Sequence, residues 1–414
     1  MKITFLTYGT DGDTRPLAAL AEELIRRGHE AQLLADRACA PLAREHGIPF
    51  TALAGDIRKA VQPGGTLGKS IDGRADMSRV ARACARLARE HTTAWMATAR
   101  TAAAGSDVLV FSGLAAFVGL AVAEALAIPC IGTALWPLTP TREFGAAFLR
   151  PRRLPGWANR LTHQAFNSLT WAMFRPAVNA ARREVFGAAP RRRMWQGYPT
   201  LYGCSPALLP RPRDWPAEVE LTGTWQLPAA AGWQPPDSLS AFLAAGEAPV
   251  YIGFGSMAGM DPQTLLEAVR GIASTRRVLF YPGWSGVDLS RLPPDVFVLG
   301  DTPHEWLFPR TAAVIHHGGA GTTHAAARAG VASVVVPFAG DQFFWAGRLR
   351  ARGIGLTCPM EDFGGADPAA LVAAACAPAM RERAREVARE MALEDGVGRA
   401  ADRILGGTAC LPLP

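Results

Sequence analysis

The segment Val314-Ile315-His316-His317-Gly318-Gly319-Ala320-Gly321-Thr322-Thr323 decides the expected fold of this 414-residue chain. Its apolar start is typical of a buried strand, its glycines of a tight turn, and its end of a helix. Small residues let backbone N–H groups approach a phosphate closely, and the helix N-terminus adds free donors and its dipole. His316 can donate to the same anion from the end of the strand. The segment therefore predicts a strand–turn–helix unit that binds a phosphate.

A second polar pair follows the next apolar run. Asp341 and Gln342 come directly after Val335-Val336-Pro337-Phe338-Ala339-Gly340. A carboxylate beside an amide suits a hexose, because the pair can accept from and donate to neighbouring hydroxyls. Alternatively, Asp341 is only the N-cap of the following helix.

Both halves of the chain alternate strand and helix patterns. The helix pattern Pro16–Arg27, with leucines at helical spacing, separates the first two strands, and short loops between such units imply parallel strands with right-handed crossovers. We therefore expect two doubly wound, Rossmann-like α/β domains whose strand ends face each other across a cleft. The expected strands are residues 3–7, 31–35, 108–111 and 130–133 in the first half, and 250–253, 277–281, 296–299, 313–316 and 334–336 in the second.

Prolines mark the boundary between the two halves, because residues 206–237 are rich in them, as a semi-rigid linker is. We assign residues 1–215 to the first domain, 216–240 to the linker and 241–390 to the second domain. Residues 391–414 form a helical tail that could cross back to the first domain.

The amino-acid composition limits the partners and the cellular location that we expect. The net charge is +7, from 43 basic and 36 acidic residues, with arginine clusters at 150–160 and 182–193. A basic patch can attract nucleic acid or anionic lipid, but no nucleic-acid recognition module is present, so we expect no nucleic-acid partner. The seven cysteines are scattered without C-x-x-C spacing, which predicts neither disulfides nor a metal site. Without a signal peptide or an 18-residue apolar stretch, the expected location is cytoplasmic.

By these motifs and several others, the chain resembles the family 1 glycosyltransferases of the two-domain GT-B fold, most closely their sterol and natural-product glucosyltransferase branch. The matching motifs are Tyr8-Gly9-Thr10-Asp11-Gly12-Asp13-Thr14-Arg15-Pro16, Cys204-Ser205-Pro206, Val250-Tyr251-Ile252-Gly253-Phe254-Gly255-Ser256, Pro303-His304-Glu305-Trp306-Leu307-Phe308-Pro309-Arg310, His316 to Thr323, and Gly340-Asp341-Gln342-Phe343-Phe344-Trp345.

The resemblance implies transfer of a hexose, expected to be glucose, from a UDP- or dTDP-sugar to a hydroxyl of a lipophilic acceptor. It also implies inversion at the sugar, with no metal and no cofactor besides the nucleotide sugar. It assigns a role to each matching residue. The diphosphate would contact His316, Gly318, Gly319, Ala320, Gly321, Thr322, Ser256 and Thr10; the nucleobase Thr302, Pro303 and His304; and the sugar Asp341 and Gln342.

Asp13 occupies the position of the family's catalytic base, on the loop after the first strand. A carboxylate about 3 Å from the acceptor hydroxyl can remove its proton as the new bond forms. Free aspartate has a pKa of about 3.9 and is a weak base. Plant members carry a histidine here instead. They also carry a ribose-binding glutamate where this chain has His324, and a stacking tryptophan where it has Asp301, so the nucleotide stays open between UDP and dTDP.

Three other interpretations compete with this one. Asp11-Gly12-Asp13 mimics the D-x-D metal motif of GT-A enzymes, although that motif normally follows several strands. The loop at Gly9–Gly12, with Asp36 ending the second strand, loosely matches a dinucleotide-binding oxidoreductase but lacks the G-x-G-x-x-G spacing. A non-catalytic helper of the same fold would be expected to lose the phosphate loop or the base.

Aromatic and arginine residues alternate between positions 144 and 175. We expect an acceptor pocket there, and its candidate residues are Trp136, Phe144, Phe148 and Trp171. Alternatively, these aromatic residues pack in the core, or the segment makes peripheral contact with an anionic membrane. The oligomeric state is expected to be monomer or homodimer.

Overall fold

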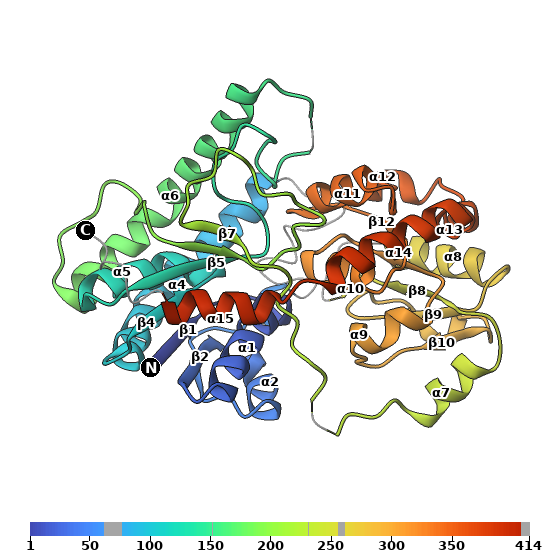
Figure 1. Ribbon diagram of the computed structural model, residues 1–414, viewed down its shortest axis with the longest axis horizontal. Helices are drawn as coiled ribbons and strands as arrows, with labels where there is room; N and C mark the ends of the chain where they lie inside the picture. Colours follow the sequence, from blue (N-terminus) through green and yellow to red (C-terminus); the bar gives the residue numbers. More distant parts are fainter. Residues whose placement is uncertain (62–76, 151, 231, 256–260, 407–414) are drawn as a thin grey trace.

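The computed structural model describes residues 1–61, 77–150, 152–230, 232–255 and 261–406. Two parallel β-sheets form two lobes, each with helices on both faces (Figure 1). This is the doubly wound architecture that the alternating pattern predicts. No described helix is long and apolar enough to cross a membrane.

The first sheet has the strand order β3-β2-β1-β4-β5-β6-β7, with every described pair parallel. The order reverses between β1 and β4, the kind of position where open α/β sheets bind ligands. Its strands are β1 (Lys2–Leu6), β2 (Glu30–Asp36), β3 (Phe50–Leu53), β4 (Val108–Phe111), β5 (Cys130–Ala134), β6 (Thr200–Tyr202) and β7 (Val219–Leu221). Its helices are α1 (Asp11–Arg26), α2 (Ala40–Glu45), α3 (Ile57–Val61), α4 (Met77–Ala103), α5 (Ala116–Leu126) and α6 (Gly156–Phe186).

The second sheet has the order β10-β9-β8-β11-β12-β13 and reverses between β8 and β11. Its strands are β8 (Val250–Gly253), β9 (Val278–Tyr281), β10 (Val296–Val298), β11 (Ala313–His316), β12 (Ser333–Val335) and β13 (Gly355–Thr357). The helices of this half of the chain are α7 (Asp237–Ala244), α8 (Pro262–Ala273), α9 (His304–Leu307), α10 (Ala320–Arg328), α11 (Gln342–Ala351), α12 (Met360–Phe363), α13 (Pro368–Ala375) and α14 (Pro378–Ala392), followed by α15 (Gly396–Gly406), which packs on the first lobe.

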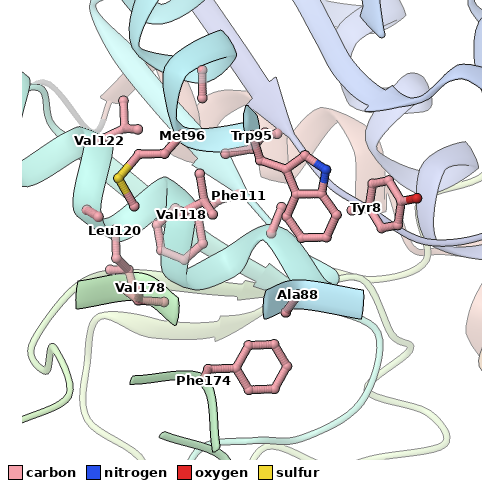
Figure 2. Close-up of a cluster of buried hydrophobic side chains, with 14 of the residues drawn as sticks. Tyr8, Ala88, Trp95, Met96, Phe111, Val118, Leu120, Val122, Phe174 and Val178 are labelled. Atoms are coloured by element: carbon pink, nitrogen blue, oxygen red, sulfur yellow. The ribbon is translucent and has the colours of Figure 1, made fainter. Parts of the chain in front are cut away.

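The main core of the first lobe lies between its sheet and the helices α4, α5 and α6. Figure 2 shows the ring of Trp95 beside that of Tyr8, with centroids 4.3 Å apart, and Phe111 among the apolar side chains of α5. Phe338 and Ala339, which follow β12 of the other lobe, belong to the same buried cluster. The two lobes therefore share apolar contacts beside the strand ends.

Two element boundaries differ from the expectation. Helix α1 begins at Asp11 rather than Pro16, because Asp13 accepts the backbone N–H of Thr10 at 2.8 Å and so caps the helix start. The first sheet continues past residue 215, because β7 pairs in parallel with β6. The connection between the sheets is therefore shorter than residues 216–240.

The C-terminal tail does return to the first lobe. Helix α15 packs against α1 (Figure 1), and Ala400, Ala401 and Ile404 are fully buried in the core under the first sheet. The crossing is tight at Gly396, where an added Cβ would lie 2.3 Å from the carbonyl oxygen of Thr224. The tail thus joins the two lobes a second time.

Because Ile404 is fully buried and Leu393 is 89% exposed, truncating each side chain should have very different effects. Ile404→Ala should lower the free energy of unfolding by about 2–5 kcal/mol in urea titration. The control Leu393→Ala should change it by less than about 0.5 kcal/mol. Equal effects would mean that α15 does not pack on the first lobe.

Candidate active site

The loop between β11 and α10 depends on two glycines. Gly318 has φ +96°, and a Cβ there would lie 2.7 Å from Cγ1 of Val335. A Cβ on Gly319 would lie 2.6 Å from Nε2 of His317. Gly319 is also the N-cap of α10 and offers no side chain to the first amides, those of Ala320 and Gly321. These N–H groups are available to an anion.

His316 ends β11 and is completely buried. Its Nδ1 accepts the N–H of Gly318 at 3.1 Å, which assigns the ring proton of the neutral form to Nε2. Burial, helped by His317 and His304, keeps the pKa of His316 well below its usual range. The Nε2 atom is buried without a hydrogen-bond partner among the described residues. An unpartnered donor of this kind is suited to an anion such as a phosphate.

The neighbouring imidazoles are neutral as well. Burial lowers the pKa of His317 to about 4. Burial also lowers the pKa of His304 to about 4, with a further contribution from the positive charge of Arg15. His304 stacks on Phe308 with ring centroids 4.3 Å apart. The second lobe therefore offers neutral donors here, and the nearby positive charge comes from Arg15 on α1 of the first lobe.

Asp13 is half-buried at the start of α1. Its Oδ2 accepts from the backbone N–H and from Oγ1 of Thr10, at 2.8 and 3.3 Å. Within the described residues, its hydrogen bonds leave Oδ1 free. Burial raises the pKa of Asp13, against the two Thr10 hydrogen bonds that lower it. The carboxylate is therefore a stronger base than a free aspartate.

Gly9 makes this position of the carboxylate possible. A Cβ on Gly9 would lie 2.2 Å from Oδ2 of Asp13. Thr10 was expected to approach the diphosphate. Instead, its backbone N–H and its hydroxyl both donate to Oδ2 of Asp13. The first function of the loop after β1 is thus to hold this carboxylate.

Asp341 and Gln342 lie at the start of α11. Oδ2 of Asp341 accepts the indole N–H of Trp345 at 2.8 Å. Oε1 of Gln342 accepts the backbone N–H groups of Phe338 and Ala339 at 2.8 and 2.9 Å. Asp341 is the N-cap residue of α11, as the structural alternative had it, but its side chain makes no capping hydrogen bond. The oxygen of Gln342 is occupied, so only its amide nitrogen is left to meet a hydroxyl.

The two carboxylates come from different lobes and influence each other. Burial raises the pKa of Asp341 to about 7, and the negative charge of Asp13 contributes to the increase. Phe148 also reaches this region, since a Cβ on Gly340 would lie 3.9 Å from its ring. The strand ends of the two sheets therefore converge on one site.

The expected nucleobase residues lie between β10 and α9. Thr302 and Pro303 are half-buried, and Pro303 is the N-cap of α9. Asp301 accepts the Tyr281 hydroxyl at 2.8 Å. His324 is buried, with Nδ1 2.7 Å from the carbonyl of Ala320 and its ring against Trp345.

Ser256 lies outside the described residues, next to Gly255. The loop that ends there passes His317, because a Cβ on Gly255 would lie 3.8 Å from Cε1 of that ring.

The four candidate acceptor residues have different surroundings. The ring of Phe148 stacks on Phe166, with centroids 4.8 Å apart, and meets Trp136 edge-on at 5.7 Å. Phe144 packs across the lobes against Phe344 at 5.3 Å. Trp171 is buried in the core of the first lobe, as the structural alternative had it. Of the four, Phe148 lies beside Gly340, and Trp136 packs against its ring.

Sequence reasoning missed two residues of the site. Trp345 lies one helical turn after Asp341, and that spacing alone points to contact. Arg15 follows Asp13 by two positions on α1, but only the folded structure places it near His304 of the other lobe. Among the described residues, no group of three or more His, Cys, Asp or Glu side chains could hold a metal ion.

The pKa of Asp341 leads to a stability prediction. Its pKa of about 7 exceeds the unfolded value of about 3.9. The folded protein thus binds the extra proton below pH 7, and stability falls as pH rises through 7. Asp341→Asn should raise the thermal midpoint more at pH 8.5 than at pH 5.5. The exposed control Asp237→Asn should shift it equally at both, and an equal shift in Asp341→Asn would contradict the assignment.

Comparison with known proteins finds two domain families in this chain. Residues 3–144 match the glycosyltransferase family 28 N-terminal domain, and residues 270–399 match the C-terminal domain of erythromycin biosynthesis protein CIII-like proteins. A sterol 3-beta-glucosyltransferase of Penicillium rubens is 34% identical over 379 residues, 86% of this chain and 27% of that protein. The chain thus spans about a quarter of the length of that curated relative.

Solved structures show the same fold. The glycosyltransferase of kitacinnamycin has a TM-score of 0.71 at 20% identity, over 100% of this chain and 99% of that one. The glycosyltransferase VinC, solved in complex with dTDP, has a TM-score of 0.69 at 19% identity, over 99% and 100%. These structures have the two-domain GT-B fold, and the chain shares that fold; its residues 3–144 match a glycosyltransferase N-terminal domain.

Proposed function

We propose that this chain transfers a hexose from a nucleoside diphosphate sugar to a hydroxyl of a small lipophilic acceptor, with inversion at the anomeric carbon and without a metal ion. The observation that carries the proposal is the approach of Asp13 in one lobe to Asp341 in the other, beside which Gln342 borders the His316 loop at Gly318. A base and a phosphate site on opposite lobes suit a reaction in which one group attacks as another leaves.

The leaving group is the nucleoside diphosphate, which departs with the electron pair of the C1–O bond. Nε2–H of His316 and the first amides of α10 donate to its oxygens. Such donors are already oriented and need no rearrangement as charge develops. Arg15 supplies positive charge from the opposite lobe.

The nucleophile is the acceptor hydroxyl. As its oxygen bonds to C1, Oδ1 of Asp13 takes the proton, so that the products are a glycoside, a nucleoside diphosphate and a protonated Asp13. The raised pKa of Asp13 brings the base closer to the working pH, which favours proton transfer. Direct displacement from an α-linked donor gives a β-glycoside.

The donor is UDP- or dTDP-glucose in this proposal. The glucose assignment follows the similarity to the fungal sterol 3-beta-glucosyltransferase, and dTDP follows the ligand of VinC. The position of His324 beneath Trp345 favours neither nucleotide. The acceptor class, a sterol, a polyketide or a similar aglycone, follows the same relatives and the aromatic residues Trp136 and Phe148.

Asp13→Asn should lower kcat by roughly 10²–10⁴-fold, because the amide cannot take the acceptor proton. Affinity for UDP and dTDP, measured by calorimetry, should stay unchanged. Asp11→Asn is the matched control, since Asp11 is exposed on the same turn, and it should keep most of the activity. Normal turnover by Asp13→Asn would remove this residue from the mechanism.

His316→Ala should weaken binding of the nucleoside diphosphate by about 1.5–3 kcal/mol, the range for a hydrogen bond to a charged group. The measurement is calorimetric titration with UDP and dTDP at pH 7. His46→Ala, which removes a ring that contacts Glu22 on α1, serves as the control and should bind normally. If His316→Ala binds both nucleotides as the parent does, the loop has only a structural role.

A further inference from the structure

The outward face of α6 carries a row of large apolar side chains. Trp157 is 67% exposed, Leu161 51% and Leu169 62%. Because residues four apart lie above one another on a helix, these three form one stripe along the first half of α6. Leu149 and Leu154, in the segment that leads into the helix, are exposed as well. We refer to these five residues as the α6 stripe.

The α6 stripe stands out from the rest of the described surface. The other large hydrophobic residues that are exposed in the described chain, Leu289, Val298 and Leu393, lie apart from it and from one another in the sequence. Single exposed apolar residues are normal, whereas a contiguous group marks an interaction site.

The stripe does not result from a loosely attached helix. Along the second half of α6, Trp171, Phe174 and Val178 are buried in the core of the first lobe. Near the start of the helix, Asn159 donates to the carbonyl of Arg142 at 3.0 Å, and His163 meets the carbonyl of Phe144 at the same distance. The helix is therefore held on its inner side, and its first half extends away from the lobe (Figure 1).

The charge around the stripe has one sign. Residues 144–183 contain no aspartate or glutamate. Several arginines of this segment are already used within the fold: Arg150 pairs with Glu361, and Arg182 with Glu124. Others are exposed and form no ion pair with a described residue. Arg183 is one of them at the end of the segment; the other four, Arg152, Arg153, Arg160 and Arg175, lie nearer the α6 stripe in the sequence, and we call these four the free arginines.

We propose that the α6 stripe and its four free arginines form a docking surface for an anionic lipid bilayer. The apolar side chains enter the boundary between headgroups and acyl chains, and the arginines lie at the phosphates. A second copy of the chain fits less well. An isologous contact would bring the arginines of both copies together, with no carboxylate in this segment to offset them.

The inner side of the same helix leads toward the candidate active site. Phe166 stacks on Phe148, which lies beside Gly340 and hence beside Asp341. If the proposed function holds, a lipophilic acceptor dissolved in the bilayer would reach the site along this path. Docking itself does not depend on that function.

The test is co-sedimentation of the full chain with vesicles. Phosphatidylcholine vesicles that contain phosphatidylglycerol should carry the protein into the pellet, and vesicles of phosphatidylcholine alone should carry far less. Binding should weaken with salt, because the Debye length falls from about 10 Å at 0.1 M to about 3 Å at 1 M. A protein that stays in the supernatant with anionic vesicles at low salt overturns the proposal.

A triple serine variant and its matched control test whether the α6 stripe is the surface that binds vesicles. Trp157→Ser with Leu161→Ser and Leu169→Ser should weaken vesicle binding by about tenfold or more, because three apolar side chains no longer leave water. The matched control replaces Leu289, Val298 and Leu393 by serine and should bind as the parent does. Equal losses in the two triple variants would contradict the assignment.

A charge variant tests the other half of the surface. Arg152→Gln with Arg153→Gln and Arg160→Gln should lose about fivefold in binding for each arginine removed. Arg44→Gln with Arg399→Gln is the control at two exposed arginines elsewhere. Sedimentation velocity tests the rival occupant, a second copy of the chain. If the parent is a dimer that does not bind vesicles, and the triple serine variant is a monomer, the α6 stripe is a self-association surface instead. Neither readout needs turnover, so the proposed function can fail while docking stands.

Discussion

Exclusion of water from the end of β11 is the constraint on which the rest of the site depends. A buried imidazole whose Nδ1 is occupied by a backbone N–H is neutral and has a single donor to offer. That donor finds no partner within the described protein, so it is available to a ligand that brings an acceptor. The glycines of the loop follow from the same constraint, because side chains at Gly318 or Gly319 would collide with Val335 or His317.

The opposite lobe contributes a carboxylate, that of Asp13, which is also held in place by a hydrogen bond to the backbone. Oδ2 of Asp13 is held by Thr10, while Oδ1 has no partner among the described residues. Burial raises the pKa of Asp13, and burial together with the charge of Asp13 raises the pKa of Asp341. The site thus combines two carboxylates from different lobes with neutral histidines of the second lobe. The return of α15 to the first lobe adds a second link between the lobes, which helps to maintain this approach.

The sequence was sufficient where structure depends on local chemistry. The expected strands and the glycine turn after His316 follow from short patterns, and the structure has them close to where they were expected. It was insufficient where distant segments meet. The strand β7 and the burial of Trp171 depend on partners far along the chain. Arg15 approaches His304 only because the lobes face each other. The start of α1 was expected at Pro16, but it depends on the hydrogen bond between Asp13 and Thr10.

The central claim is that Asp13 and the His316 loop act on opposite sides of one anomeric carbon. Proton NMR of the product tests it most directly. The reaction would use UDP-α-glucose or dTDP-α-glucose with a sterol or polyketide acceptor, in buffer containing EDTA. The account predicts a β-glycoside, identified by the large coupling constant of its anomeric proton, formed at an undiminished rate. An α-glycoside, or product that appears only after Mg²⁺ or Mn²⁺ is restored, would contradict it.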